Sequence, residues 1–237
     1  MNCCLFSMAQ QNKVRIGAGE WRGRLISFPA VEGLRPTPDR VRETLFNWLG
    51  QTLDGKVCLD LFAGSGALGF EALSRGARRV VMVEQNPQVL KALQENARKL
   101  GANGHGKNVA TEDETRHTRF PLPNPLPLAG SPHLNPLPQA GEEANVKGAG
   151  FDRLDLVAGD GLKALSCGGQ SFDVIFLDPP FQRGILPLLL PLLPQRLAPG
   201  GFVYVETEAA LEPGEGWEVW RSGRAGNVFY CLLKRKQ

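Results

Sequence analysis

From residue 56 onward the sequence alternates between short apolar runs and amphipathic stretches. Five of the apolar runs are typical of buried strands: 57–62, 79–84, 154–158, 172–177 and 202–206. Helices are predicted between them at 67–75, 86–100 and 184–197. Such repeats form parallel sheets with right-handed crossovers. A closing hairpin is predicted at 217–221 and 228–234. We therefore expect an α/β fold with a doubly wound, mostly parallel, seven-stranded sheet.

The chain before this repeat predicts a small N-terminal extension. Residues 14–28 alternate in polarity around three glycines, which indicates a β-hairpin. Thr37 is the expected N-cap of a following helix, with Pro38 at its first position. We expect a disordered tail at 1–13, the hairpin and helix at 14–50, and the main domain at 51–237.

Residues 103–149 interrupt the strand and helix pattern. They contain all three histidines, and seven of the 18 prolines lie within 121–138. So many prolines exclude a helix or a central strand, and the segment NPLPLAG is nearly repeated as NPLPQAG. We expect a mobile, low-complexity insertion, with a Pro-rich recognition segment as the alternative. The remaining chain would then contain no histidine for acid/base chemistry.

Charge and cysteine content restrict the partners and the compartment. The net charge is only +3, but residues 221–237 carry five basic side chains and no acidic one. This favours a polyanionic partner, or basic ends that only promote solubility. The five cysteines form no C-x-x-C pair and no metal-binding spacing, which is typical of a reducing cytoplasm and predicts no metal. No apolar run reaches 18 residues, so no membrane span is expected.

The first chemical motif is DLFAGSGALG, residues 60–69, between a predicted strand and a helix. Glycines at such a turn let the backbone approach a nucleotide-type cofactor closely. Glu84 ends the next strand, where its carboxylate is placed to accept from ribose hydroxyls. Asp160 follows the third strand and is either an acceptor for an adenine amino group or a helix N-cap. NAD and S-adenosylmethionine (SAM) both fit these residues.

The second motif is Asp178-Pro179-Pro180-Phe181, after the fourth strand. Ligands of open α/β sheets bind at the carboxyl ends of the strands, so this motif is expected to lie in the same crevice as the glycine turn. The carboxylate of Asp178 and the carbonyl of Pro179 are two acceptors for an exocyclic amine, and Phe181 is a flat surface for stacking a base. An NAD-dependent oxidoreductase has no use for this arrangement.

Together these motifs resemble the SAM-dependent amino-methyltransferases with a D/N-P-P-Y/F motif. RIGAGEWRGR (15–24), RPTPDRVRETLFNWL (35–49), the 60–76 stretch, Glu84 and 178–181 are similar to RsmD-type methyltransferases, which modify N2 of a guanine in 16S ribosomal RNA. The resemblance covers nearly the whole chain outside 1–13 and 103–149.

The resemblance implies a cytoplasmic, monomeric enzyme that uses SAM and acts on ribosomal RNA, within the small ribosomal subunit. The expected SAM-binding residues are Asp60, Phe62, Ala63, Gly64, Gly66, Glu84, Asp160 and Gly161. The expected catalytic residues, which hold the guanine, are Asp178, Pro179, Pro180 and Phe181. The candidate RNA contacts are Arg15, Arg22, Arg24, Arg35, Arg40 and Arg42, some of which are alternatively structural ion-pair partners. Three other functions stay open: an adenine-N6 or other amino-methyltransferase of DNA or RNA, an NAD-dependent oxidoreductase, and a non-catalytic RNA-binding protein.

Overall fold

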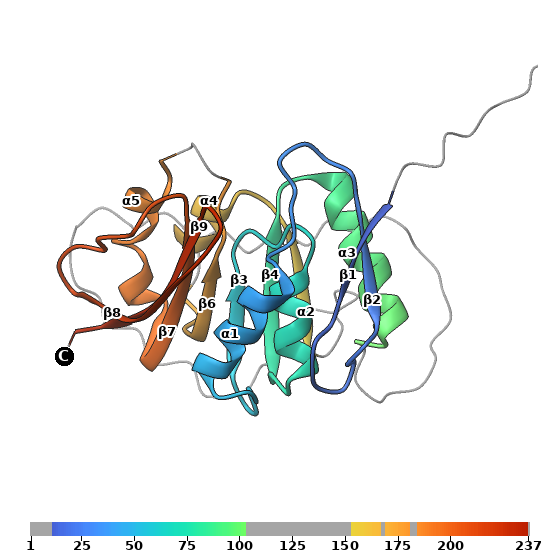
Figure 1. Cartoon of the computed structure of the whole chain (residues 1–237), viewed down its shortest axis with the longest axis horizontal. Helices are drawn as coiled ribbons and strands as arrows, with labels where there is room; N and C mark the ends of the chain where they lie inside the picture. Colours follow the sequence, from blue (N-terminus) through green and yellow to red (C-terminus); the bar gives the residue numbers. More distant parts are fainter. Residues whose placement is uncertain (1–10, 103–152, 167–168, 181–183, 237) are drawn as a thin grey trace, which may run out of the picture.

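The computed structural model describes residues 11–102, 153–166, 169–180 and 184–236. The predicted insertion, the tail at 1–10 and Phe181 lie outside the described residues. In the described part the main sheet has seven strands in the order β5-β4-β3-β6-β7-β9-β8 (Figure 1). Their bounds are β3 Val57–Asp60, β4 Arg79–Glu84, β5 Leu154–Ala158, β6 Phe172–Leu177, β7 Leu197–Thr207, β8 Trp217–Ala225 and β9 Val228–Arg235.

The first five of these strands run parallel, and β9 and β8 add an antiparallel edge. This confirms the predicted mostly parallel, seven-stranded sheet. The N-terminal extension also forms as expected, with a two-stranded hairpin of β1 Gln11–Arg15 and β2 Leu25–Pro29. β1 begins three residues before the expected start of the hairpin.

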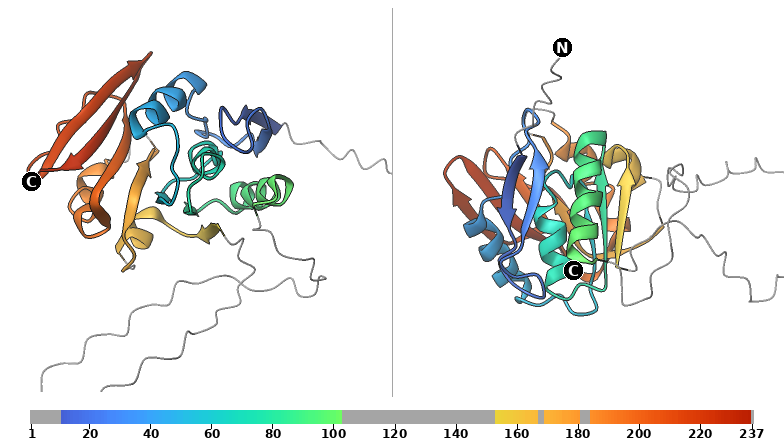
Figure 2. Two further views of the ribbon diagram at one scale, coloured as in Figure 1. Left: turned by 90° about the horizontal axis from the view of Figure 1, so that it is seen from below. Right: turned by 90° about the vertical axis from the view of Figure 1, so that its right-hand side faces the viewer.

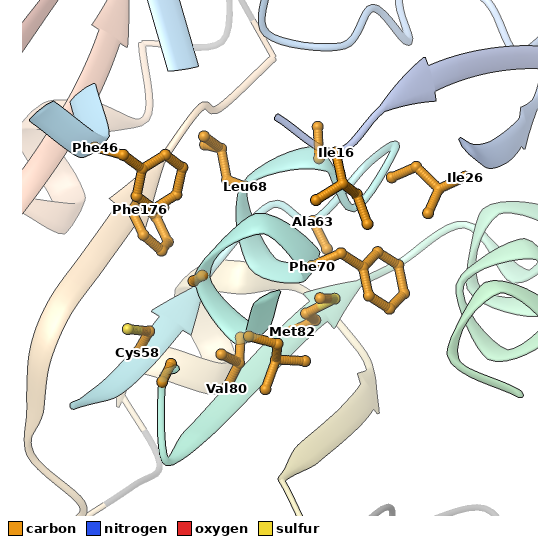
Figure 3. Packing of buried hydrophobic residues seen from close by; sticks show 14 of the residues in the cluster. Ile16, Ile26, Phe46, Cys58, Ala63, Leu68, Phe70, Val80, Met82 and Phe176 are labelled. Atoms are coloured by element: carbon orange, nitrogen blue, oxygen red, sulfur yellow. The ribbon is translucent and has the colours of Figure 1, made fainter. Parts of the chain in front are cut away.

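Helices cover both faces of the sheet (Figure 2). One face packs against the hairpin, α1 Asp39–Leu49, α2 Ala67–Ser74 and α3 Pro87–Leu100. In Figure 3, Ile16 and Ile26 of the extension lie near Phe70 of α2, and Phe46 of α1 lies against Phe176 of β6. The extension therefore shares its core with the main domain. The other face packs against α4 Gly161–Ser166, α5 Leu186–Leu189 and a 3₁₀ turn, η1 Leu193–Gln195.

The structure corrects two predictions of local structure. The single helix expected at 184–197 is wrong, because the chain there forms only the short α5 and η1. Pro191 and Pro194 have no backbone N–H to donate to an earlier turn, which ends a continuous helix. The N-cap role expected for Thr37 is also wrong: α1 starts at Asp39 after Pro38, with no side-chain cap. No helix among the described residues is long and apolar enough to cross a bilayer.

Candidate active site

The parallel strands bring the predicted cofactor and catalytic residues to one edge of the sheet. Asp60 ends β3, Glu84 ends β4, and Asp178 directly follows β6. The registers align these ends, because Asp60 pairs with Met82 of β4 and Phe176 of β6. Asp160 follows β5, next to Glu84 through the pairing with Ala158. The structure therefore brings both sequence motifs to the same edge.

The glycine turn after β3 is held in place by Glu84. The Gly64 N–H donates to Oε2 of Glu84 at 2.9 Å, and the Asn86 N–H donates to Oε1 at 2.8 Å. Each carboxylate oxygen has a second lone pair, so Glu84 is oriented and still able to accept from a ligand hydroxyl. Phe62 and Gly64 are partly exposed, whereas Ala63 is buried.

Three glycines around the site are required by geometry, one in the turn and one each in α2 and α4. Gly66 has a φ of 77°, and an added Cβ would lie 2.6 Å from Leu93 Cδ2. A Cβ on Gly69 would lie 2.3 Å from Met82 Cε, so this glycine lets α2 approach β4. Gly161 likewise leaves no room for a side chain, with Phe62 Cε1 2.9 Å from its Cβ position. These glycines let the turn, α2 and the start of α4 pack closely together.

Asp160 makes one of the two interactions expected for it. Its Oδ1 accepts the Lys163 N–H at 3.1 Å, which caps α4. The residue is partly exposed, and its carboxylate has acceptor capacity beyond this bond. The helix-cap role is therefore present, and it is compatible with binding an adenine amino group.

Asp60 is almost completely buried beneath the glycine turn. It is 2% exposed, and its Oδ2 accepts the Gly69 N–H of α2 at 3.1 Å. The pKa of Asp60 is raised from 3.8 to about 7, mainly by burial; the charges of Glu84 and Glu206 also raise it, and hydrogen bonds from Gly69 and Phe62 lower it. The carboxyl group of Asp60 therefore accepts from an N–H in the first turn of α2.

Asp178 lies in an acidic environment at the end of β6. It is partly exposed, Pro179 is buried and Pro180 is exposed. Burial raises the pKa of Asp178 well above 3.8, and so do the charges of Glu206 and Asp60. We call Asp60, Asp178 and Glu206 the acidic cluster. Among the described residues, no cation forms an ion pair with any of the three.

Glu206 is the member of this cluster that sequence reasoning missed. It is 3% exposed near the end of β7, and its Oε1 accepts the Tyr204 hydroxyl at 2.9 Å. The side chain of Thr37, from the segment before α1, lies close enough to Glu206 to lower its pKa. The sequence did contain a signal for it, because Glu206 is an acidic residue at the end of the predicted buried strand 202–206.

The acidic cluster decides between the two cofactors that fitted the sequence. The pyrophosphate of NAD would lie beside three acidic side chains, each of which it would disfavour in the charged form, and the Gly69 N–H of α2 already donates to Asp60. SAM carries a sulfonium and an ammonium group and no phosphate, so an acidic edge fits it. The residues present fit SAM and do not fit a dinucleotide.

The six arginines predicted to contact RNA do not gather in one place. Arg35 and Arg40 are exposed and flank Thr37 in the sequence, near the carboxyl edge of the sheet. The loop that carries Arg22 bonds to Ser74 at the far end of α2, and Arg24 donates to Lys99 and Leu100 at the end of α3. Arg15 is exposed and donates to Gly23 in the same loop. These three arginines therefore lie toward the opposite edge of the sheet.

Arg42 is placed in the interior instead. Its side chain is 3% exposed and forms ion pairs with Asp39 at 3.0 Å and Glu71 at 3.5 Å. It also donates to the Thr37 and Arg15 carbonyls. Arg75 pairs with Glu71 at 2.8 Å. We call Arg42, Glu71 and Arg75 the mixed cluster. Arg42 holds the extension against α2, and we do not include it among the proposed RNA contacts.

The fold and the acidic glycine-turn site define a class I methyltransferase. The family model described as "Conserved hypothetical protein 95" matches residues 14–123 and 142–234, and the chain belongs to this family. It is 34% identical to ribosomal RNA small subunit methyltransferase D of Haemophilus influenzae, over 94% of this chain and 95% of that protein. The Escherichia coli protein of the same name is 35% identical, over 94% and 91% of the two chains.

A solved structure supports the same assignment. The structure described as putative methyltransferase yhhF from Escherichia coli superposes with a TM-score of 0.66 at 33% identity. The alignment covers 95% of this chain and 99% of that one. These comparisons confirm the family and the fold class that the motifs predicted.

Proposed function

We propose that this protein transfers a methyl group from SAM to the exocyclic N2 amine of a guanine in 16S ribosomal RNA. The observation that carries the proposal is the position of Asp178 and Pro179 at the sheet edge that also holds the glycine turn and Glu84. The named relatives, which are ribosomal RNA methyltransferases, support the substrate class. The acidic edge supports SAM over NAD.

The residues of the glycine turn and the neighbouring strand ends would hold SAM. Glu84 accepts from the ribose hydroxyls, Asp160 from the adenine amine, and the turn at 62–66 lies against the ligand, as does Gly161. When bound, SAM supplies a methyl group on a positively charged sulfur. A cation at this edge would in turn favour the charged form of Asp60, beneath the turn.

Asp178 and Pro179 act on the amine of the guanine. The Asp178 carboxylate and the Pro179 carbonyl accept the two N2–H donors, which turns the nitrogen lone pair toward the methyl group. Two consecutive prolines keep these acceptors in a fixed orientation, and orientation of this kind contributes roughly 7–11 kcal/mol in well-aligned reactions. Phe181, outside the described residues, is proposed to stack on the guanine.

The RNA is proposed to approach over the segment before α1. Arg35 and Arg40 are exposed there, beside the site edge, and would neutralise phosphates next to the flipped guanine. Arg15, Arg22 and Arg24 would contact RNA only at a distance from the reacting base. We further propose that the protein acts as a monomer, in the cytoplasm and without a metal ion.

The test is methyl transfer from labelled SAM to small ribosomal subunits that lack this modification, with naked 16S RNA and duplex DNA as parallel substrates. We expect label in N2-methylguanosine from the subunit or its RNA. Label in N6-methyladenosine would assign the site to adenine instead. Binding of SAM and RNA without any transfer would indicate a non-catalytic RNA-binding protein.

A further inference from the structure

The buried carboxylate of Glu206 lies next to Asp178 and has no part in the reaction described so far. The parallel register pairs Phe176 with Tyr204 and Leu177 with Val205, so the next residues of the two strands are Asp178 and Glu206. Alternate residues of a strand face the same side, and the Phe176 and Tyr204 rings lie 6.5 Å apart on the face covered by α1. Asp178 and Glu206 therefore follow these two rings toward the site.

The hydrogen bonds of Glu206 favour its charged form. The Tyr204 hydroxyl donates from 2.9 Å, and the Thr37 side chain lies close by. Burial raises the pKa of Glu206, while both hydroxyl groups lower it. Burial and the nearby Glu206 charge raise the pKa of Tyr204 well above 10, so this hydroxyl stays protonated and keeps donating.

We propose that Glu206 is a positioning residue whose negative charge makes Asp178 the proton acceptor for the methylated amine. The inference rests on the proposed function, because it concerns the amine that Asp178 binds. Glu206 is too deeply buried to touch the guanine itself, at 3% exposure. It acts through Asp178. A second carboxylate nearby disfavours the charged form of Asp178, so that Asp178 accepts a proton more readily.

The proton balance of the transfer shows why this matters. The amine nitrogen forms a bond to the methyl carbon, and the carbon–sulfur bond breaks with its electron pair on sulfur. The nitrogen is then positively charged until one N–H proton leaves, with the N–H electron pair remaining on nitrogen. Asp178 receives that proton, and a base whose pKa lies near the working pH does so most effectively.

Among the groups around Asp178, Glu206 is the neighbouring charge with the largest effect on the pKa of Asp178. Asp60 on β3 also raises the pKa of Asp178, and Glu84 on β4 acts on Asp60. Tyr204 on β7 stays protonated, and Tyr230 on β9 and Thr37 contribute only hydroxyl groups. Arg42 on α1 donates to the Thr37 carbonyl but forms its ion pairs with Asp39 and Glu71. Of the two neighbouring carboxylates, Glu206 has the larger effect on Asp178.

The test compares pH profiles of methyl transfer to small ribosomal subunits for the wild type and Glu206→Gln. The glutamine keeps an oxygen that accepts from Tyr204 but removes the charge. We expect the acid limb of the kcat profile to move down by about one pH unit. The plateau kcat should fall because Asp178 becomes a weaker base, while KM for the subunit stays unchanged.

Two more variants separate this role from a purely structural one. Tyr204→Phe removes one donor to Glu206, so Glu206 holds a proton more often and the acid limb should shift in the same direction by less. Glu71→Gln is the matched control, because Glu71 is a buried glutamate of the mixed cluster at 1% exposure. It should lose stability without a shifted profile. If the wild type transfers methyl groups and both Glu206→Gln and Tyr204→Phe keep its profile, the inference is wrong. A wild type that transfers none would instead refute the proposed function.

Discussion

Two groups of buried charged side chains lie on the same side of the sheet, and their composition differs. In the mixed cluster, Glu71 has Arg75 at 2.8 Å and Arg42 at 3.5 Å. In the acidic cluster, Asp60, Asp178 and Glu206 form no ion pair with any described cation, and the pKa of each is raised, mainly by burial. Neighbours of opposite charge stabilise the mixed cluster, whereas like charges destabilise the acidic one.

The difference separates a structural from a functional use of buried charge. Pairing opposite charges joins the N-terminal extension to α2, because Arg42 reaches Glu71 and two carbonyls of the extension. Three carboxylates without a cation weaken the fold and are expected where a cationic ligand and a departing proton must be received. The partners of a buried charged side chain, rather than its burial alone, therefore indicate whether its role is structural or functional.

The largest expected effect is on turnover. Asp178→Ala removes the carboxylate that accepts from the amine and takes its proton. We expect kcat to fall by about 10²–10⁴-fold, the usual contribution of a positioned acid/base group. SAM affinity, measured by calorimetry, should change little, and the folded state should gain stability because a like charge is removed. Near-normal methylation would contradict the role of Asp178.

The next effect is on stability, in the mixed cluster. Arg42→Ala leaves Glu71 without one of its two partners and removes two hydrogen bonds to the extension. Breaking a buried pair from one side typically destabilises by about 3–5 kcal/mol. Urea unfolding measures the change. Arg40→Ala, on the exposed side of the same helix, is the control and should stay within about 0.5 kcal/mol. Equal losses for the two variants would remove the distinction between them.

The third effect is the pH dependence of stability. Because the pKa of Asp60 is raised from 3.8 to about 7, the folded protein binds this proton more tightly than the unfolded chain does. The contribution of Asp60 is fully present below about pH 4 and is lost as the pH rises through about 7, by at most about 1.4 kcal/mol for each pH unit. Asp60→Asn should flatten this part of the curve, measured as the free energy of unfolding at several pH values. An unchanged slope would show that Asp60 does not titrate in this window.

The parts of the site that could be predicted from the sequence are those built by local spacing. The glycine turn, Glu84 at a strand end and Asp178-Pro179 each lie within a few residues of a recognisable strand. Parallel strands then bring their carboxyl ends together without further information. For the same reason the sheet was predictable, since its strands are short apolar runs with helices between them.

The parts that could not be predicted depend on contacts between distant segments. Thr37 precedes a helix and is a residue type common at N-caps, yet its side chain lies close to Glu206, near the other end of the chain. Arg42 lies off the apolar stripe of α1, and only the packing of the hairpin and α2 makes it buried. Thr37 and Arg42 each interact with polar groups of a segment distant in the sequence, and a pattern along one helix does not reveal such contacts.

The smallest effect is expected from an ion pair that differs from the mixed cluster mainly in exposure. Arg79 and Asp155 lie 2.6 Å apart, closer than Arg75 and Glu71 at 2.8 Å. The side chains of the first pair are 48% and 34% exposed, and those of the second 8% and 2%. Water and salt screen the exposed pair, so Arg79→Ala should lower the free energy of unfolding by less than about 1 kcal/mol, and by less still in high salt. Arg75→Ala should lower it several-fold more, with little response to salt. If urea unfolding gives similar losses for both variants, proximity rather than burial determines how much these ion pairs contribute.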